Sequence, residues 1–204
     1  MMPAKMSERE YRRCAEFRTL EDGDCTVEGY ATTFDQPYLL YDFGDYAVYE
    51  TIDKRAFDGC DMSDVIMQYD HAGHVYARNK NGTLRLTPDD IGLKVTAELC
   101  GTSAGRQLYE EIKGGYTDKM SFCFVVSDAK RDTEMRDGKT IVTRRILKIK
   151  KLYDVSAVSV PANDMTTISA RSCCDGVIAE LEAERLSALD IARRKLAIKI
   201  KMEG

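Results

Sequence analysis

The stretch TIVTRRILKIKKLYDVSAVSVP, residues 140–161, decides the fold class of this chain. It is dominated by residue types that favour β-strands, and Pro161 ends it because proline cannot donate a hydrogen bond to a neighbouring strand. This pattern predicts either two strands or one long bent strand. Both interpretations require partner strands elsewhere in the sequence.

Partner strands are predicted along most of the chain. Four runs are rich in β-branched and aromatic residues: CTVEGYATTF (25–34), YAVYETI (46–52), DVIMQYDH (64–71) and KMSFCFVV (119–126). The third is expected to be a short buried strand that ends at His71 and is followed by a loop containing Gly73. In GTLRLTPDDIGLKVTAEL (82–99), turn residues separate two strand-like runs, so we expect a hairpin.

One helix is predicted with clear boundaries, in GTSAGRQLYEEIKGG (101–115). Apolar residues recur every four positions from Ala104 to Ile112, which is typical of a helix that buries one face. Thr102 or Ser103 can cap its start, and Gly114 is expected in the left-handed conformation just past its end.

The remaining segments define the predicted domain organisation. Residues 1–20 are expected to be a loosely held arm or a first edge strand, residues 21–172 the folded domain, and residues 173–204 a helical tail. The charged segment 127–140 is expected to be a loop with a turn at Asp137 and Gly138. Many strands and few helices predict a β-barrel or sandwich decorated by helices, not a doubly wound α/β protein.

Composition excludes several function classes. The chain has 204 residues and a formal net charge of -4, which gives no general attraction to nucleic acid or anionic lipid. It has no apolar run of about 18 residues, and its start lacks the apolar centre of a secretory signal, so we expect synthesis in the cytosol and no membrane span. The seven cysteines include no CxxC pair, which argues against a disulfide framework or a structural zinc site and favours reduced, buried thiols.

Ser121 is the residue whose role the pattern leaves open. A serine becomes nucleophilic when a base takes its proton, and the only histidines are His71 and His74. If the strand is extended to His71, that side chain shares a face with Tyr69, and Asp70 points away from it. Ser121 is expected on the face opposite Met120, Phe122 and Phe124, which we expect in the core. Taken alone, a serine in a strand and a single histidine are ordinarily structural residues.

A resemblance to a known family supplies the functional hypothesis. VEGYATTFDQP, YETIDKRAFD, QYDHAGHVYAR, GTLRLTPDDIGLKVTAEL, SAGRQLYEEIKGGYTDKMSFCF and LYDVSAVSVPANDMTTISAR resemble, in this order, blocks of the caudoviral prohead serine protease family over about residues 27–171. The resemblance implies a phage capsid maturation protease. It also implies an α+β fold related to herpesvirus assemblins, with a mainly antiparallel β-barrel and surrounding helices.

The resemblance also implies residue roles. Ser121 in Met-Ser-Phe would be the nucleophile, His71 in Asp-His the general base, and Asp154 in Tyr-Asp-Val-Ser the residue that orients the imidazole. Glutamate is more usual at the position of Asp154. Ser156 shares the strand face of Asp154 and could line the same site, and a backbone N–H in PAND (161–164) could stabilise an oxyanion.

Two local alternatives remain open beside these roles. His74 is expected to be a loop or rim residue but could be the third member of a triad. Cys123 could in principle be a thiol nucleophile, although nothing around it in the sequence indicates a lowered pKa.

The implied activity is that of a serine endopeptidase. It would cleave the scaffold or delta-like segment of a major capsid protein, and itself, inside the prohead assembling in the host cytoplasm. We expect a homo-oligomer that needs no metal or organic cofactor and binds no specific nucleic acid. The alternatives are a catalytically silent assembly scaffold or capsid-binding protein with the same fold, and an unrelated β-rich binding domain.

Overall fold

The structure, a computed structural model, describes residues 9–19, 25–42 and 44–158, together with Ala183, Leu186, Ser187 and Ile191, which are helical. The side chains of residues 13–17 are outside this description. Ten strands dominate: β1 (Glu10–Thr19), β2 (Thr26–Thr33), β3 (Tyr38–Asp42), β4 (Tyr46–Ile52), β5 (Ile66–Tyr69), β6 (Ala72–Arg78), β7 (Leu84–Pro88), β8 (Gly92–Glu98), β9 (Lys119–Arg136) and β10 (Lys139–Val158). One α-helix, α1 (Ser103–Lys113), and a short 3-10 helix, η2 (Asn79–Asn81), accompany them. The prediction of a mainly β protein with few helices is confirmed.

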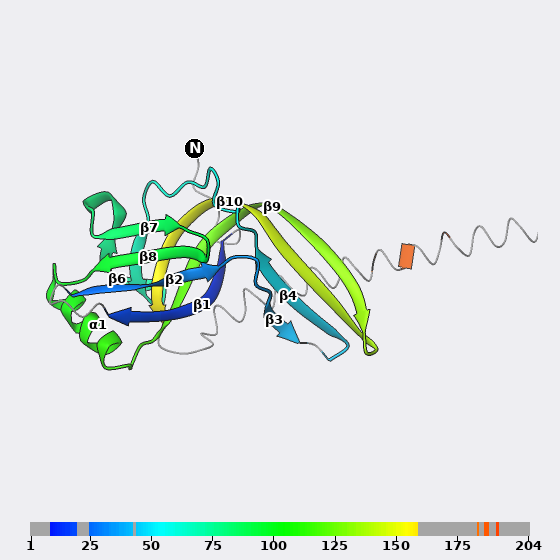
Figure 1. The fold of residues 1–204 in the computed structure, drawn as a ribbon, viewed down its shortest axis with the longest axis horizontal. Helices are drawn as coiled ribbons and strands as arrows, with labels where there is room; N and C mark the ends of the chain where they lie inside the picture. Colours follow the sequence, from blue (N-terminus) through cyan, green and yellow to red (C-terminus); the bar gives the residue numbers. More distant parts are fainter. Residues whose placement is uncertain are drawn as a thin grey trace, which may run out of the picture.

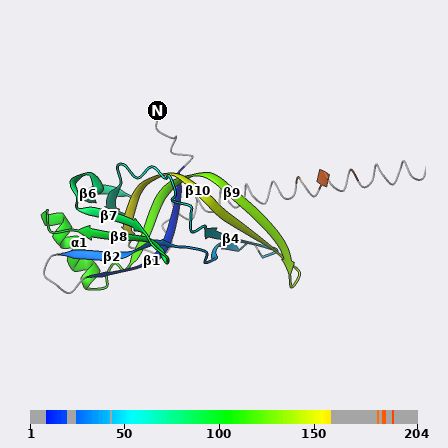
Figure 2. The same ribbon diagram turned by 45° about the horizontal axis from the view of Figure 1, so that its top comes forward.

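All ten strands belong to one sheet, with the order β3-β4-β10-β9-β1-β2-β8-β7 (Figure 1). Beside this path, β5 pairs with β10, and β6 pairs with β5. Pairing is antiparallel except where β10 runs parallel to β4 and to β5. The strand path described here ends at β3 and β7, which are not joined, so a closed barrel is not confirmed. The strands curve strongly around the core, as the turned view in Figure 2 shows.

The stretch that decides the fold forms one long strand. The first half of β10 pairs with β4 through residues 140–146, and its second half pairs with β5 through residues 154–157. Several register irregularities along its ladder with β9 allow the bend. The first of the two sequence interpretations, two separate strands, is therefore wrong.

The charged segment expected to be a loop is also strand. β9 continues to Arg136, and only Asp137 and Gly138 form the turn, both with positive φ (52° and 79°), as a two-residue hairpin turn requires. The prediction of a loop failed because the charged side chains of β9 alternate along a hairpin arm that extends away from α1 and is solvent-exposed (Figure 1). The predicted turn is confirmed, as is the hairpin formed by β7 and β8.

Strand β1 lies inside the sheet. It pairs with β9 on one side and with β2 on the other, so the expectation of a loose arm or an edge strand for these residues is wrong. The charged residues of β1 suggested an exposed segment. The Arg12 side chain is nevertheless almost fully buried, because it forms an ion pair with Glu50 of β4. Strand β1 therefore belongs to the body of the protein.

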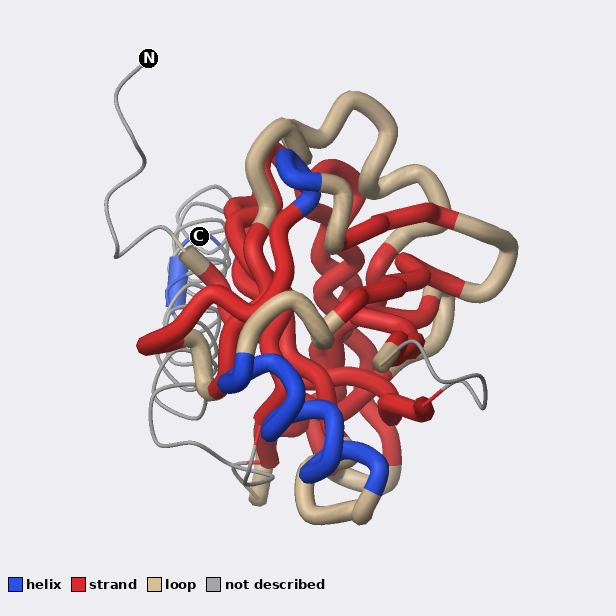
Figure 3. The backbone as a smooth tube through the Cα atoms, turned by 90° about the vertical axis from the view of Figure 1, so that its left-hand side faces the viewer, coloured by secondary structure: helices blue, strands red, loops and turns tan. Residues whose placement is uncertain are grey.

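Helix α1 agrees with the prediction at its start and differs at its end. The Thr102 side chain accepts a hydrogen bond from the Gly105 N–H at 3.0 Å, and Leu108 and Ile112 are buried. Gly114 is right-handed (φ -78°), and Gly115 takes the left-handed conformation (φ 73°) instead. Figure 3 shows α1 (blue) lying across the strands.

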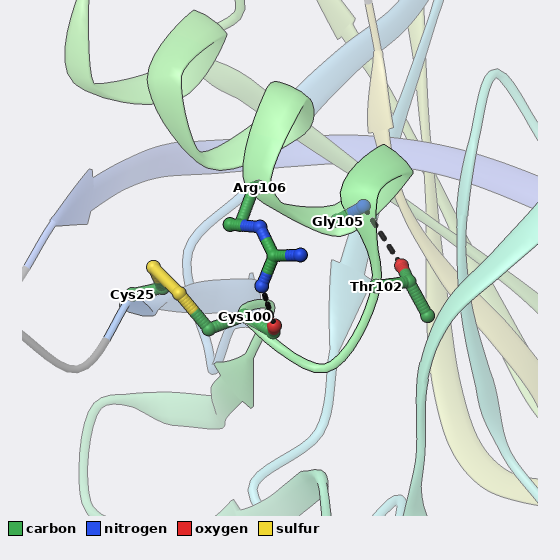
Figure 4. Close-up of a disulfide and its surroundings, with 5 residues drawn as sticks. All are labelled: Cys25, Cys100, Thr102, Gly105 and Arg106. Atoms are coloured by element: carbon green, nitrogen blue, oxygen red, sulfur yellow. Dashed lines mark hydrogen bonds between the residues drawn. A yellow bond between two sulfur atoms is a disulfide. The ribbon is translucent and has the colours of Figure 1, made fainter.

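Two cysteines form a disulfide, which corrects the expectation that the thiols are reduced. Cys25 precedes β2 and Cys100 follows β8, and their Cα atoms are 5.3 Å apart (Figure 4). The antiparallel pairing of β2 with β8 brings them together, and the Leu99 N–H donates to the Cys25 carbonyl. A separation of 75 residues conceals this proximity in the sequence.

The predicted C-terminal helical tail, residues 173–204, lies outside the described residues except for the four helical positions named above. None of the helices in the described ranges is both long and apolar enough to cross a membrane.

Candidate active site

His71 lies in a tight turn and not at the end of a strand. β5 ends at Tyr69, which pairs with Ala72 of β6, so Asp70 and His71 are the two turn residues, with φ of 47° and 57°. The expected loop at Gly73 is therefore part of β6. Positive φ at both positions is the geometry of a type I′ hairpin turn, which aspartate and histidine adopt more often than most other residues except glycine and asparagine.

This turn corrects the predicted direction of the His71 side chain. The extended geometry would have placed it beside Tyr69, whereas the turn places it against Asp154 of β10 and Ser121 of β9. The Asp70 N–H donates to the Ala157 carbonyl at 2.9 Å, which fixes the turn to β10. Backbone strain of this kind costs about 1–3 kcal/mol and is typical of functional sites.

Four polar side chains share one face of the β9–β10 ladder. Ser121 lies opposite Ser156, and Cys123 lies opposite Asp154. Residues opposite each other in an antiparallel pair point to the same face, so these four form a compact group. The other face of β9 bears Met120, Phe122 and Phe124, all fully buried in the core, which confirms the expected orientation of this strand.

The imidazole of His71 joins Ser121 to Asp154. Nδ1 lies 2.5 Å from Asp154 Oδ1, and Nε2 lies 2.6 Å from Ser121 Oγ. A carboxylate only accepts hydrogen bonds, so Nδ1 carries the proton and Nε2 can accept from the serine hydroxyl. The three residues singled out by the resemblance thus lie in one hydrogen-bonded row.

Asp154 is held in place by a second donor. The Ser156 hydroxyl donates to Asp154 Oδ1 at 2.8 Å, and both side chains are nearly or fully buried. The expectation that Ser156 lines the same site agrees with this contact. A buried carboxylate with two donors has a fixed position, which is what an orienting group needs.

The Ser121 hydroxyl has a second neighbour that the sequence did not indicate. Its Oγ lies 2.9 Å from the backbone carbonyl oxygen of Arg12 in β1. The hydroxyl has one proton and two acceptors within reach, Nε2 of His71 and this carbonyl. When Nε2 is unprotonated, it can take the serine proton. When the imidazole is charged, the proton goes to the carbonyl of Arg12.

Tyr11 of β1 is another neighbour missed from the sequence. Its ring packs edge to face against the imidazole of His71, with centroids 4.8 Å apart and planes at 74°. Burial raises the pKa of Tyr11 to about 12, together with a hydrogen bond to Cys123 and the nearby charge of Asp154. The charged, non-periodic sequence of residues 1–20 did not indicate that Tyr11 contacts His71.

Neither of the two alternatives from the sequence takes the role suggested for it. Burial and the charge of Asp154 raise the pKa of the Cys123 thiol to about 12, so it is protonated at neutral pH, the opposite of an activated thiolate. His74 packs against Tyr76 and lines a cavity of about 320 Å³ together with Gln107 and Glu111 of α1. The ring that contacts Asp154 is that of His71.

A buried ion cluster anchors β1 beside the site. The Arg12 guanidinium contacts Glu50 at 2.5 and 3.0 Å, and Arg144 of β10 contacts both Glu50 and Glu10. The Tyr38 hydroxyl donates to Glu50 at 2.6 Å. The cluster links strands β1, β3, β4 and β10, so the backbone of β1 is held where it meets Ser121.

The segment 161–164, suggested as a source of oxyanion donors, lies outside the described residues. No curated protein and no solved structure is significantly similar to the chain. A sequence profile described as Caudovirus prohead serine protease matches residues 13–176, which include Ser121, His71 and Asp154. This family acts in phage capsid maturation, within the capsid that assembles in the host. The chain therefore belongs to the caudovirus prohead serine protease family.

Proposed function

We propose that the chain is a serine endopeptidase that cleaves the scaffold or delta-like segment of the major capsid protein, and itself, inside the assembling prohead. The observation that carries this proposal is the row of contacts from Asp154 through His71 to Ser121, at 2.5 and 2.6 Å. This arrangement is the one by which serine hydrolases activate their nucleophile.

The reaction follows from the positions of the protons. Ser121 Oγ attacks a peptide carbonyl carbon while its proton passes to His71 Nε2. The tetrahedral intermediate collapses as the imidazolium gives that proton to the departing amine, which leaves an ester on Ser121. A water molecule then attacks the ester, with His71 again taking and returning one proton, and the acid product leaves.

Asp154 would keep the imidazole in the tautomer with the proton on Nδ1 and stabilise the imidazolium without being protonated itself. The shorter side chain of aspartate, in place of the more usual glutamate, is compatible with this role. The turn at Asp70 and His71 is tied to β10 through Ala157, so the imidazole lies close enough for an aspartate to reach it.

Further parts of the hypothesis remain predictions. We propose that the enzyme is a homo-oligomer without specific nucleic-acid binding, and that its fold is related to the herpesvirus assemblin barrel. The division into an arm (1–20), a protease domain (21–172) and a helical tail (173–204) is proposed with the change that part of the arm, β1, pairs within the sheet.

The alternative is a catalytically silent assembly protein with the same fold. It receives no support from the site, because a silent scaffold needs neither an aligned imidazole nor a buried orienting carboxylate. The two hypotheses differ in what happens when only the hydroxyl of Ser121 is removed.

The test is co-expression with the major capsid protein encoded beside this chain. Wild type, Ser121→Ala and a control, Ser127→Ala, are compared by intact-mass analysis of all fragments. Ser127 lies on the same strand but is exposed, and its hydroxyl donates to the Lys148 carbonyl. We expect the same cleavages in wild type and in the control and none in Ser121→Ala. Intact capsid protein in all three, within well-formed proheads, supports the silent scaffold.

A further inference from the structure

Strand β1 contributes two groups to the site that the three-residue mechanism does not include. The Tyr11 ring contacts the imidazole of His71, and the Arg12 carbonyl contacts the hydroxyl of Ser121. Both come from a strand that the sequence indicated only as an arm or an edge. The contacts raise the question of what holds the imidazole in its working orientation.

We propose that Tyr11 is a positioning residue, which holds the imidazole of His71 so that Nδ1 faces Asp154 and Nε2 faces Ser121. The inference rests on the proposed function, because it assigns Tyr11 a part in the same reaction. Tyr11 acts through His71 and does not itself touch the reacting atoms.

The need for such a residue follows from the position of His71. Its side chain leaves a two-residue turn, so it lacks the strand neighbours on both sides that confine a residue within a sheet. A rotation of the ring out of its present plane would move both nitrogens and so lengthen the contacts to Asp154 and Ser121 together. Edge-to-face packing at 4.8 Å resists that rotation, because a rotated imidazole loses its favourable geometry against the tyrosine ring.

Tyr11 is itself fixed at both ends. It lies opposite Cys123 in the ladder, and its hydroxyl forms a hydrogen bond with the Cys123 thiol. At the backbone, Arg12 Nη1 donates to the Tyr11 carbonyl at 2.9 Å, and the same guanidinium is bound by Glu50. The ring therefore has a defined place from which to restrain the imidazole.

The experiment uses the full-length protein and a fluorophosphonate, which forms a bond with an activated serine, as the probe. Three substitutions of Tyr11 separate the ring from the hydroxyl. Tyr11→Phe keeps the ring, whereas Tyr11→Leu and Tyr11→Met remove it and leave apolar side chains of different shape. Tyr153→Leu is the matched control, because this tyrosine precedes Asp154 in β10 but packs against Arg9 and Lys151.

We expect the labelling rate of Ser121 to fall at least tenfold in the two variants without the ring. Tyr11→Phe and the control should stay within about threefold of wild type. The low-field proton resonance of His71 Nδ1–H, a signature of its bond to Asp154, should weaken in the ringless variants and persist in Tyr11→Phe.

Three outcomes decide the matter. Ringless variants that label at the wild-type rate, or keep the Nδ1–H resonance unchanged, overturn the positioning role. If the ringless variants do not fold, the role is judged from Tyr11→Phe, and a tenfold loss in that variant overturns it, because the ring is still present. Failure of the wild type itself to label at Ser121 rejects the proposed protease activity instead.

Discussion

Replacement of Asp154 by asparagine tests the proposed mechanism most directly. Oδ1 of Asp154 accepts hydrogen bonds from His71 at 2.5 Å and from Ser156 at 2.8 Å. Asparagine keeps the shape but offers one oxygen and one NH₂ group. If the NH₂ group takes the position of Oδ1, it faces both Nδ1 and the Ser156 hydroxyl, which then has to accept from it. The NH₂ group drives the imidazole proton to Nε2, where it blocks acceptance of the serine proton.

The size of the effect follows from this change of tautomer. Loss of the correct tautomer in a serine triad lowers kcat by roughly 10⁴-fold, which corresponds to about 5.4 kcal/mol at about 1.36 kcal/mol per tenfold. Asp154 is buried behind the imidazole, so it has no contact with a peptide substrate. We therefore expect kcat and kcat/KM to fall together while KM is unchanged.

The assay measures single-turnover cleavage of a capsid-derived substrate by wild type, Asp154→Asn and a control, Asp128→Asn, which changes an exposed aspartate of β9. Thermal unfolding of each variant establishes that the folded state is retained. The reasoning is refuted if Asp154→Asn is folded and loses less than tenfold in kcat, because another group would then hold the imidazole.

Three further predictions concern stability and thiol chemistry. Glu50→Gln removes the fully buried carboxylate that neutralises two arginines. We expect the free energy of unfolding to fall by about 3–5 kcal/mol and the thermal unfolding midpoint by about 6–20 °C. The control Glu134→Gln changes an exposed residue and should have little effect on either. Burial alone would raise the pKa of Glu10, but hydrogen bonds and charges from neighbouring arginines lower it below its ordinary 4.5. Its stabilisation is therefore complete above pH 4.5 and is lost as the pH falls, so the midpoint of Glu10→Gln should vary less with acid than that of wild type. Alkylation of the unfolded, unreduced protein should leave Cys25 and Cys100 unmodified, and reduction should make both reactive; modification before reduction contradicts the disulfide.

The parts of the fold that depend on local pattern could be predicted from the sequence. The β-forming run around Asp154, the hairpin of β7 and β8 and the buried face of β9 with Phe122 each follow from residue type and period-two alternation. The helix cap at Thr102 follows from side-chain chemistry that acts within three residues.

The parts that depend on distant partners could not be predicted in this way. From the sequence, Arg12 is expected to be a surface charge. Its burial depends on an ion pair with Glu50, which lies 38 residues away along the chain. The turn at His71 has no sequence signal strong enough to outweigh the strand pattern before it, so the direction of the imidazole was predicted wrongly. The association of Ser121 with His71 and Asp154 came from family resemblance, because spacing along the chain does not determine distance in space.

The parallel pairing of β5 with β10 also determines when the site can form. In the described sheet, β5 pairs only with β6 and β10, so the hairpin that carries His71 has no place to dock until β10 exists. Asp154 follows His71 by 83 residues, which a ribosome adds in about 4–17 s at about 5–20 residues per second. The nascent chain thus contains the histidine and then the serine well before Asp154 is added. The three residues can come together only near the end of the domain's synthesis. Under the proposed function, translation itself would delay proteolytic competence.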